Sequence, residues 1–260
     1  MEATHSYYNQ ANPDLLYQIP VNASAVLEIG CGTGALGRAY KEINPDVIYI
    51  GVEVAESPSN YAKKYLDYVI NQDISNDPKL ELPDSTNTFD CIIFGDVLEH
   101  LANPLEVIQC LSTLLKDTGI VLACIPNVQH WSAISNLIVG EWPEQDSGLF
   151  DRTHLKWFTY KSIIKLFTDA NLNIFQIKPR IFNGSKAVDF VEALKPALHN
   201  FGISPQDFLQ KTAPLQYVIK AGLKPKTRIN LCGCMLKPQA GMTDVRMIQP
   251  LRSVASLGNI

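Results

Sequence analysis

Four acidic residues lie within or directly after the apolar runs of the first hundred residues. Glu28 stands in VLEIGCGTG, Glu53 ends VIYIGVE, Asp73 follows the short run YVI, and Asp96 follows FDCIIF. If these runs are parallel strands, their carboxyl ends meet at one edge of a sheet, where such sheets bind ligands. Carboxylates at that edge accept hydrogen bonds from ribose hydroxyls and attract cationic groups such as an amine or a sulfonium.

Closely spaced glycines follow the first of these runs. Glycine lets the backbone turn sharply and approach a ligand closely, with the amides of the next helix pointing at it. Residues 32–37, GTGALG, also satisfy G-x-G-x-x-G, the dinucleotide pattern, in which Glu53 would bind the ribose. Glu28, two residues before Gly30, does not suit a pyrophosphate, so this frame favours a ligand with a cationic group.

Three of the five histidines lie where they could take a proton from an acceptor hydroxyl. His100 ends DVLEH, His130 follows the run GIVLACIPN, and His154 lies in DRTH, on the loop beyond it. A general base must lie within hydrogen-bond reach of the hydroxyl, and a loop residue has the better geometry if a cap closes. We therefore expect His154 to be the base, with Asp151 as its orienting partner, and keep His100 and His130 as alternatives.

Apolar runs alternate with helical patterns along most of the chain. This alternation predicts an α/β fold with a doubly wound, mostly parallel sheet covered by helices on both faces. The expected strands span residues 25–29, 47–52, 68–70, 89–94, 119–125, 172–177, 216–221 and 229–236. The expected helices span residues 35–43, 55–66, 104–115, 130–139, 160–170, 190–201 and 205–211.

The same alternation divides the chain into a lid, a core, a segment that completes the sheet, and a tail. We expect these four parts to span, in that order, residues 1–24, 25–180, 181–236 and 237–260. We expect a helical acceptor cap inserted into the core at about residues 127–158, because the alternation of strand and helix patterns stops after Pro126. Tyr8 is expected to close over the bound ligand as part of the lid.

The composition is that of an ordinary globular protein, with 46% hydrophobic and 18% charged residues. No apolar run approaches the ~20 residues of a membrane helix, and no signal peptide is visible. We therefore expect a cytoplasmic protein whose six cysteines are reduced. Residues 1–150 hold 20 acidic and 6 basic residues, a poor surface for nucleic acid. Residues 151–230 hold 13 basic and 5 acidic residues, which suits an acidic or phosphate-linked small molecule.

Taken together, VLEIGCGTG, NQDI and FGDVLEH resemble the class I S-adenosylmethionine-dependent methyltransferases, over about residues 7–180. The resemblance implies their Rossmann-like seven-strand fold, S-adenosylmethionine as cofactor and S-adenosylhomocysteine as product. It also implies that Glu53 binds both ribose hydroxyls. The resemblance implies that the methionine moiety lies against Glu28, Gly30, Cys31, Gly32 and Gly34. The adenine is implied to lie against Asp73 and Ile74, and the sulfur side of the cofactor against Gly95, Asp96 and Val97.

Three further stretches, YYNQANPDLL, DVLEHLANP and GLFDRTHLKWFT, are similar to the branch found beside glycosyltransferases in bacterial surface-polysaccharide pathways. That similarity implies a sugar hydroxyl on a nucleotide- or lipid-linked saccharide as acceptor. Arg152, Lys156 and Arg180 are then candidate anchors for its acidic groups. The acceptor pocket would be walled by Trp131, Trp142, Phe150, Trp157 and Phe158.

Several alternatives remain open from the sequence. One is an NAD(P)-dependent oxidoreductase, and another is a cofactor-binding module without catalysis. A third is a metal-assisted O-methyltransferase, because Asp96, Glu99 and His100 resemble the set that binds a divalent ion in ubiquinone-pathway O-methyltransferases. Our primary expectation includes no metal, and it leaves a homodimer open.

Overall fold

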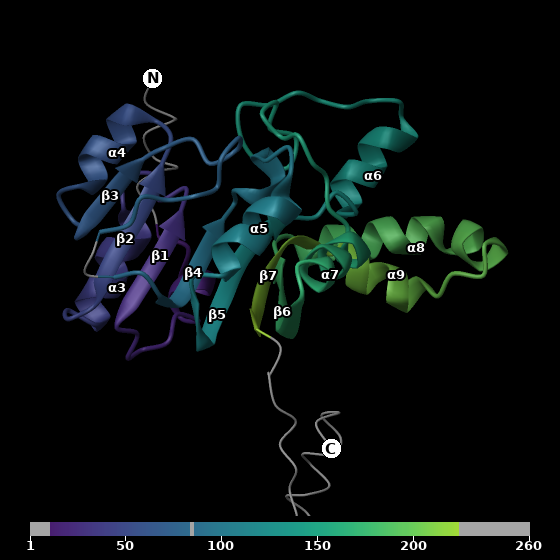
Figure 1. The fold of residues 1–260 in the computed structure, drawn as a ribbon. Coiled ribbons are helices and arrows are strands. Elements are labelled where there is room, and N and C mark those ends of the chain that lie inside the picture. The colour runs from purple at the N-terminus through teal and green to yellow at the C-terminus, as the bar shows by residue number, and fades with distance from the viewer. Residues whose placement is uncertain (1–10, 84–85, 224–260) are drawn as a thin grey trace, which may run out of the picture. The chain divides into compact units, whose positions relative to one another are not determined.

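A seven-stranded sheet forms the centre of the computed structural model, which describes residues 11–83 and 86–223 (Figure 1). Its strand order is β3-β2-β1-β4-β5-β7-β6. Strands β1 to β5 pair in parallel, and β7 lies antiparallel between β5 and β6. The strands are β1 (Ala25–Ile29), β2 (Ile48–Glu53), β3 (Tyr68–Asn71), β4 (Phe89–Gly95), β5 (Leu115–Pro126), β6 (Leu172–Ile181) and β7 (Pro214–Leu223). The predicted doubly wound, mostly parallel fold is confirmed.

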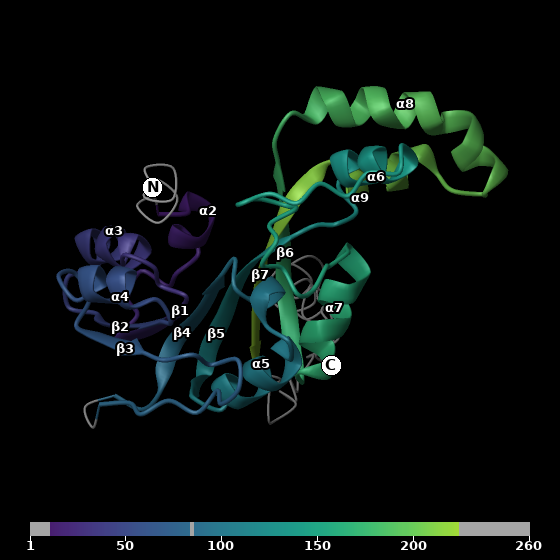
Figure 2. The ribbon, with the colours of Figure 1, turned by 90° about the horizontal axis from the view of Figure 1, so that it is seen from above.

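Helices cover both faces of this sheet (Figure 2). Every residue of β1 is buried, because strands between two helical layers are apolar on both sides. One core lies beneath α5 and α7 and includes Ile108 and Phe167, and the other lies beneath α2, α3 and α4 and includes Tyr40. The helices are α2 (Pro13–Leu16), α3 (Ala35–Ile43), α4 (Glu56–Ala62), α5 (Pro104–Ser112), α6 (Trp131–Ile138), α7 (Tyr160–Asp169), α8 (Gly184–Asn200) and α9 (Pro205–Thr212).

Five predicted boundaries are wrong by three or more residues. Helices α4 and α5 end early, at Ala62 and Ser112 rather than at residues 66 and 115, and β6 continues to Ile181 rather than ending at residue 177. The other two are the starts of α8 and β5. Helix α8 begins at Gly184 rather than at residue 190, directly after Asn183 in the left-handed conformation, and it continues through Pro196. Strand β5 begins at Leu115 rather than at residue 119, because Leu115 pairs with Phe89 across a register shift. The α2 helix and a short 3-10 helix, η1 (Leu98–His100), were not predicted, since neither is long enough to show a period.

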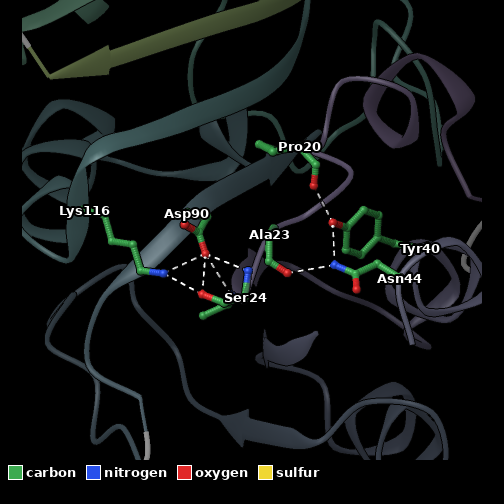
Figure 3. Close-up of polar contacts among 8 residues, drawn as sticks. Pro20, Ala23, Ser24, Tyr40, Asn44, Asp90 and Lys116 are labelled. Carbon is green, nitrogen blue, oxygen red and sulfur yellow. Dashed lines mark hydrogen bonds and ion pairs between the residues drawn. The ribbon is translucent and has the colours of Figure 1, made fainter. Parts of the chain in front are cut away.

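Polar contacts fix the amino ends of the central strands (Figure 3). One oxygen of Asp90, on β4, accepts hydrogen bonds from the amides of Ser24 and Ala25 at 2.8 and 3.0 Å and from the ammonium of Lys116 at 2.8 Å. The side chain of Asn44 donates to the carbonyl of Ala23 at 2.7 Å. These contacts fix the chain where it enters β1, at the amino ends of the strands. The carboxyl ends of β1, β2 and β4 lie on the opposite side of the sheet.

Some predictions lie outside the described residues: the lid residue Tyr8, the strand over 229–236 and the tail over 237–260. Within the described residues, no helix is both long and apolar enough to cross a membrane. Four described cysteines, Cys31, Cys91, Cys110 and Cys124, are free thiols, as predicted.

Candidate cofactor and acceptor site

The glycine turn after β1 has a backbone that only glycine adopts easily. Gly30, Gly32 and Gly34 have φ values of 69°, 53° and 78°. A Cβ atom on Gly30 would lie 2.5 Å from Cγ2 of Val97, so this glycine also allows the loop after β4 to approach the turn. The turn therefore lies close to the loop after β4, so the residues predicted to bind the methionine moiety lie beside those predicted to face the sulfur.

The carboxylate of Glu53 is fixed at the carboxyl end of β2. The side chain is buried, and its two oxygens accept hydrogen bonds from the amide of Gly32 at 2.9 Å and from the amide of Ala55 at 2.8 Å. Each oxygen keeps a second lone pair, so the carboxylate can still accept hydrogen bonds from a diol. Asn71, which the sequence did not single out, joins β3 to this point by donating to the carbonyl of Glu53 at 2.7 Å.

Glu28 lies on β1 and is buried. The hydroxyl of Tyr49 donates to its carboxylate at 2.9 Å. Burial raises the pKa of Glu28 to about 8, so the carboxyl is protonated at neutral pH unless a cation joins it. Burial, with help from Glu28 and Glu53, also raises the pKa of the neighbouring Cys31 thiol, which stays protonated.

The predicted adenine residues lie beyond β3. Asp73 is exposed, and its carboxylate accepts a hydrogen bond from the amide of Ser75 at 2.8 Å, which lowers its pKa. Ile74 is buried in the core. The exposed carboxylate is therefore ionised, and the apolar neighbour is held in place beside it.

Asp96 lies in a strained turn after β4. Its φ is 55°, which a non-glycine residue adopts at a cost of about 1–3 kcal/mol. The side-chain amide of Gln216 donates to its carboxylate at 2.6 Å, and burial raises the pKa of Asp96 to about 6. Asp96 is thus engaged by β7, a contact that the sequence did not predict.

Arg180, one of the predicted anchors for an acidic acceptor, has partners within the chain. Its guanidinium donates to Asp14 at 2.8 Å and to the side-chain oxygen of Gln216. Lys178 contacts the same Asp14 carboxylate at 2.7 Å. These contacts form because α2 packs beside the sheet and presents Asp14 to β6, a long-range contact that no local pattern reveals. The other predicted anchors, Arg152 and Lys156, are exposed, and Arg152 pairs with Asp146 at 2.7 Å.

Two of the predicted histidines lie side by side. The rings of His100 and His154 have centroids 4.8 Å apart in an edge-to-face arrangement. The loop that carries His154 is fixed to η1, because the amides of Leu155 and Lys156 donate to the carbonyl of Glu99 at 2.8 and 2.9 Å. His154, on the loop, and His100, on η1 after β4, therefore form one cluster.

Glu99 is the buried acid of this histidine cluster. Only 1% of the residue is exposed, and within the described residues neither carboxylate oxygen has a hydrogen-bond partner. Oε1 lies 3.9 Å from Nε2 of His154. Burial raises the pKa of Glu99 and lowers that of His154, so both groups are neutral near pH 7.

Asp151 orients a different residue from the one predicted. Its carboxylate accepts hydrogen bonds from the amide of Thr153 at 2.8 Å and from the hydroxyl of Thr153 at 2.6 Å. The Thr153 hydroxyl in turn lies 3.0 Å from Nδ1 of His100. The partner of Asp151 is thus His100, through Thr153, because the loop folds back over η1.

His130 has a local structural contact. Its Nδ1 lies 2.7 Å from the hydroxyl of Ser132 at the start of α6, and burial lowers the pKa of His130 to about 4. The ring packs against Trp131, with centroids 5.3 Å apart. This histidine therefore caps α6.

The predicted aromatic wall divides into three groups. Trp131 packs on His130 and on Phe190 of α8, with centroid distances of 5.3 and 6.4 Å. Trp142 packs edge-to-face on Trp157 and on Phe150, with centroid distances of 5.7 and 5.0 Å. Both tryptophans are more than 40% exposed. Phe158 instead belongs to the main core, so the exposed aromatic surface comes from the loop around residues 142–157.

The residues that could hold a metal ion differ from the sequence expectation. Among the described residues, Glu99, His100 and His154 present ligand atoms that all lie within 4.8 Å of one another. Asp96 does not belong to this set, because its carboxylate is turned to Gln216. The two unpartnered oxygens of Glu99 fit a cation chemically, and His154 takes the place predicted for Asp96.

Comparison with known proteins points to one family. The sequence profile of the methyltransferase domain family matches residues 3–177. A ubiquinone biosynthesis O-methyltransferase of Cereibacter sphaeroides is 25% identical over 173 residues, which cover 65% of this chain and 68% of the relative. The corresponding enzyme of Colwellia psychrerythraea is 34% identical over 121 residues, 45% of this chain and 47% of the relative.

Solved structures share the fold. A SAM-dependent methyltransferase of Thermotoga maritima matches with a TM-score of 0.57 and 16% identity, covering 86% of this chain and 94% of that one. An O-methyltransferase from a polyketide multienzyme of Brevibacillus brevis, solved with S-adenosylhomocysteine, matches with a TM-score of 0.52 and 17% identity, covering 83% and 72%. These matches show the shared fold, and the match to the methyltransferase domain family favours S-adenosylmethionine over a nicotinamide as the cofactor. The chain therefore belongs to the methyltransferase domain family and is a class I S-adenosylmethionine-dependent methyltransferase.

Proposed function

We propose that this methyltransferase methylates a hydroxyl group of a small molecule. The observation that carries the proposal is the pair His100–His154 beside the end of β4, where an imidazole is available to take a hydroxyl proton. The curated relatives named above are O-methyltransferases of ubiquinone biosynthesis, which agrees with an oxygen acceptor.

The proposed cofactor site follows the carboxyl ends of β1 to β4. Glu53 accepts hydrogen bonds from the ribose hydroxyls, and Glu28 faces the amino group of the methionine moiety. Asp73 and Ile74 contact the adenine. The remaining proposed lining residues are Gly30, Cys31, Gly32 and Gly34 on the turn, Gly95, Asp96 and Val97 on the sulfur side, and Tyr8 from the N-terminal lid.

The proposed reaction is an in-line displacement at the methyl carbon. S-adenosylmethionine, when bound, would supply the methyl group to the acceptor oxygen, and its sulfur would keep the electron pair of the broken carbon–sulfur bond. Alignment of donor and acceptor supplies much of the acceleration. The hydroxyl proton passes to Nε2 of His100, which we propose as the base in place of His154, since His154 is almost fully buried and His100 is partly exposed.

For the acceptor we propose a sugar hydroxyl on a nucleotide- or lipid-linked saccharide of a polysaccharide pathway in the cytoplasm. Exposed faces of Trp142 and Trp157 offer a surface on which a sugar ring can pack, and Lys156 adds an exposed cation nearby in sequence. We also propose that residues 127–158 form the acceptor cap, that the enzyme does not act on nucleic acid, and that it forms a homodimer.

A metal-assisted reaction is the second candidate, and the unpartnered carboxylate of Glu99 is the observation that favours it. Glu99, His100 and His154 would hold the ion. A divalent ion there would act as a Lewis acid and lower the pKa of the acceptor hydroxyl. Treatment with a chelator followed by removal of the chelator separates the candidates: unchanged turnover contradicts the metal route, and loss that Mg²⁺ or Mn²⁺ restores supports it.

The direct test of the proposed function uses methyl-labelled S-adenosylmethionine. The full chain is incubated with the small-molecule fraction of a cell extract, and labelled products are identified by mass spectrometry. We expect label in a methyl ether of a small molecule. Label chiefly in protein or RNA, or in a methylated amine, would contradict the proposal.

A further inference from the structure

We infer that Thr153 is a positioning residue that fixes the tautomer of His100, with the proton on Nδ1 and the free lone pair on Nε2. The inference rests on the proposed function, because His100 is the proposed base. The tautomer itself, however, follows from contacts within the chain and does not depend on the identity of the acceptor.

The hydroxyl of Thr153 lies against the carboxylate of Asp151. An ionised carboxylate only accepts hydrogen bonds. The same carboxylate oxygen of Asp151 lies 2.6 Å from the hydroxyl of Thr153 and 2.8 Å from its backbone amide, which can only donate, so this oxygen is the acceptor for Thr153. The single hydroxyl proton of Thr153 is therefore directed to Asp151.

With its proton used in this way, the Thr153 hydroxyl can only accept a hydrogen bond from His100. Its oxygen lies 3.0 Å from Nδ1 of the imidazole. The backbone carbonyl of Thr153, which is also only an acceptor, lies 3.3 Å from the same nitrogen. Two acceptors thus face Nδ1, and the opposite tautomer would place a lone pair against both of them.

The consequence for the reaction is that Nε2 of neutral His100 carries the lone pair. A neutral imidazole has one donor and one acceptor nitrogen, and only the acceptor nitrogen can take a proton from a hydroxyl. The charged and titratable groups around His100 are Asp151 behind Thr153, the adjoining ring of His154, and Glu99 beside His154.

Three variants separate this role from a merely structural one. Thr153→Val removes the hydroxyl while keeping the shape of the side chain, and Thr153→Ser keeps the hydroxyl. Asp151→Ala leaves the hydroxyl but frees its proton, which can then be donated to Nδ1. Because Thr153 is exposed, the valine variant is expected to fold, and Thr168→Val, at an exposed position of α7, is the matched control.

The primary readout is the ¹⁵N NMR spectrum of the His100 ring in the full chain at alkaline pH, without acceptor. We expect the Nδ1–H tautomer in the wild type, the serine variant and the Thr168→Val control, and a shift toward Nε2–H in Thr153→Val and Asp151→Ala. An Nε2–H tautomer in the wild type, or a wild-type spectrum in Thr153→Val, would overturn the inference.

The second readout is turnover beside cofactor affinity. Loss of one hydrogen bond of ordinary strength corresponds to about a 10-fold change, so Thr153→Val should lower kcat about 10-fold. Thr153→Ser should restore kcat, and affinity for S-adenosylhomocysteine should stay constant in both. Full kcat in Thr153→Val would overturn the positioning role. Full kcat in His100→Ala would instead contradict His100 as the base, and the NMR result would still decide the tautomer.

Discussion

The carboxylate of Glu53 accepts a hydrogen bond from the backbone amide of Gly32 at 2.9 Å, and this bond joins the end of β2 to the glycine turn after β1. The turn is also held from its other side, because the amides of Gly30 and Cys31 donate to the carbonyl of Val52 at 2.8 and 3.0 Å. A carboxylate fixed in this way loses little further freedom when a ligand binds, so its contacts to a ligand cost little entropy.

Replacement of Glu53 should weaken cofactor binding. In Glu53→Ala the ribose hydroxyls lose a charge-assisted acceptor worth ~1.5–3 kcal/mol, which corresponds to a 10-fold or greater loss of affinity. Calorimetry with S-adenosylhomocysteine measures the effect. Glu56→Ala, an exposed acid in the first turn of α4, is the matched control and should bind normally. Equal affinity in both variants would mean that the ribose is held elsewhere.

A side chain at Gly30 should disrupt the turn beyond the cost of its positive φ. Gly30→Ala combines a strained backbone with a Cβ atom 2.5 Å from Val97. Gly140 also has a positive φ, but nothing lies within 4 Å of its Cβ position, so Gly140→Ala isolates the backbone strain of ~1–2 kcal/mol. Urea unfolding should show a larger loss of unfolding free energy in Gly30→Ala. Similar losses in the two variants would contradict a close contact between the turn and Val97.

The burial of Glu28 should make stability fall as the pH rises. Its pKa is about 8 in the folded chain and near its ordinary value of 4.5 in the unfolded chain, so between these values the unfolded chain loses the proton first. The free energy of unfolding then declines by ~1.4 kcal/mol per pH unit from this group. Unfolding curves between pH 5 and 8 should show less decline in Glu28→Gln than in the wild type. Parallel curves would contradict the raised pKa.

Arg180 should contribute more to stability than Lys178, although both pair with Asp14. The Arg180 side chain is 15% exposed and also donates to Gln216, whereas the Lys178 side chain is 50% exposed. Arg180→Ala leaves partly buried partners unpaired and should cost ~1.5–3 kcal/mol. An exposed ion pair contributes ~0–1 kcal/mol, so Lys178→Ala should be mild. Urea unfolding of both variants checks the order, and a reversed order would contradict the larger contribution assigned to the less exposed Arg180.

Single replacements of the histidines should separate the base from its neighbours. We expect His100→Ala to lower turnover by ~10²–10⁴ with cofactor affinity retained, which is the usual effect of losing a general base. His154→Ala should have a smaller effect, and His130→Ala should affect stability, since His130 caps α6. Turnover and cofactor binding are measured together on each variant. Near wild-type turnover in all three would leave proximity or a metal ion as the source of catalysis.

The sequence determined the main features of the fold by itself. Long apolar runs alternating with amphipathic segments specify a parallel sheet between two helical layers, since each run must be buried on both sides. The helix over Ala35–Ile43 was predicted to the residue. Glu53 and the glycine turn could be placed at the ligand-binding side of the sheet because each directly follows or ends a strand, and the carboxyl ends of parallel strands lie side by side.

Only the tertiary structure decided which side chains form partnerships across long distances in the chain. Asp14 meets Arg180, Gln216 meets Asp96, and Thr153 links Asp151 to His100. No local period encodes these contacts, because each depends on how a loop or a short helix packs on the finished sheet. The sequence identified the histidines as candidates by their places in the motifs, but the orientation of a ring depends on the acceptors that surround it. Those acceptors come from a loop more than fifty residues away in the chain.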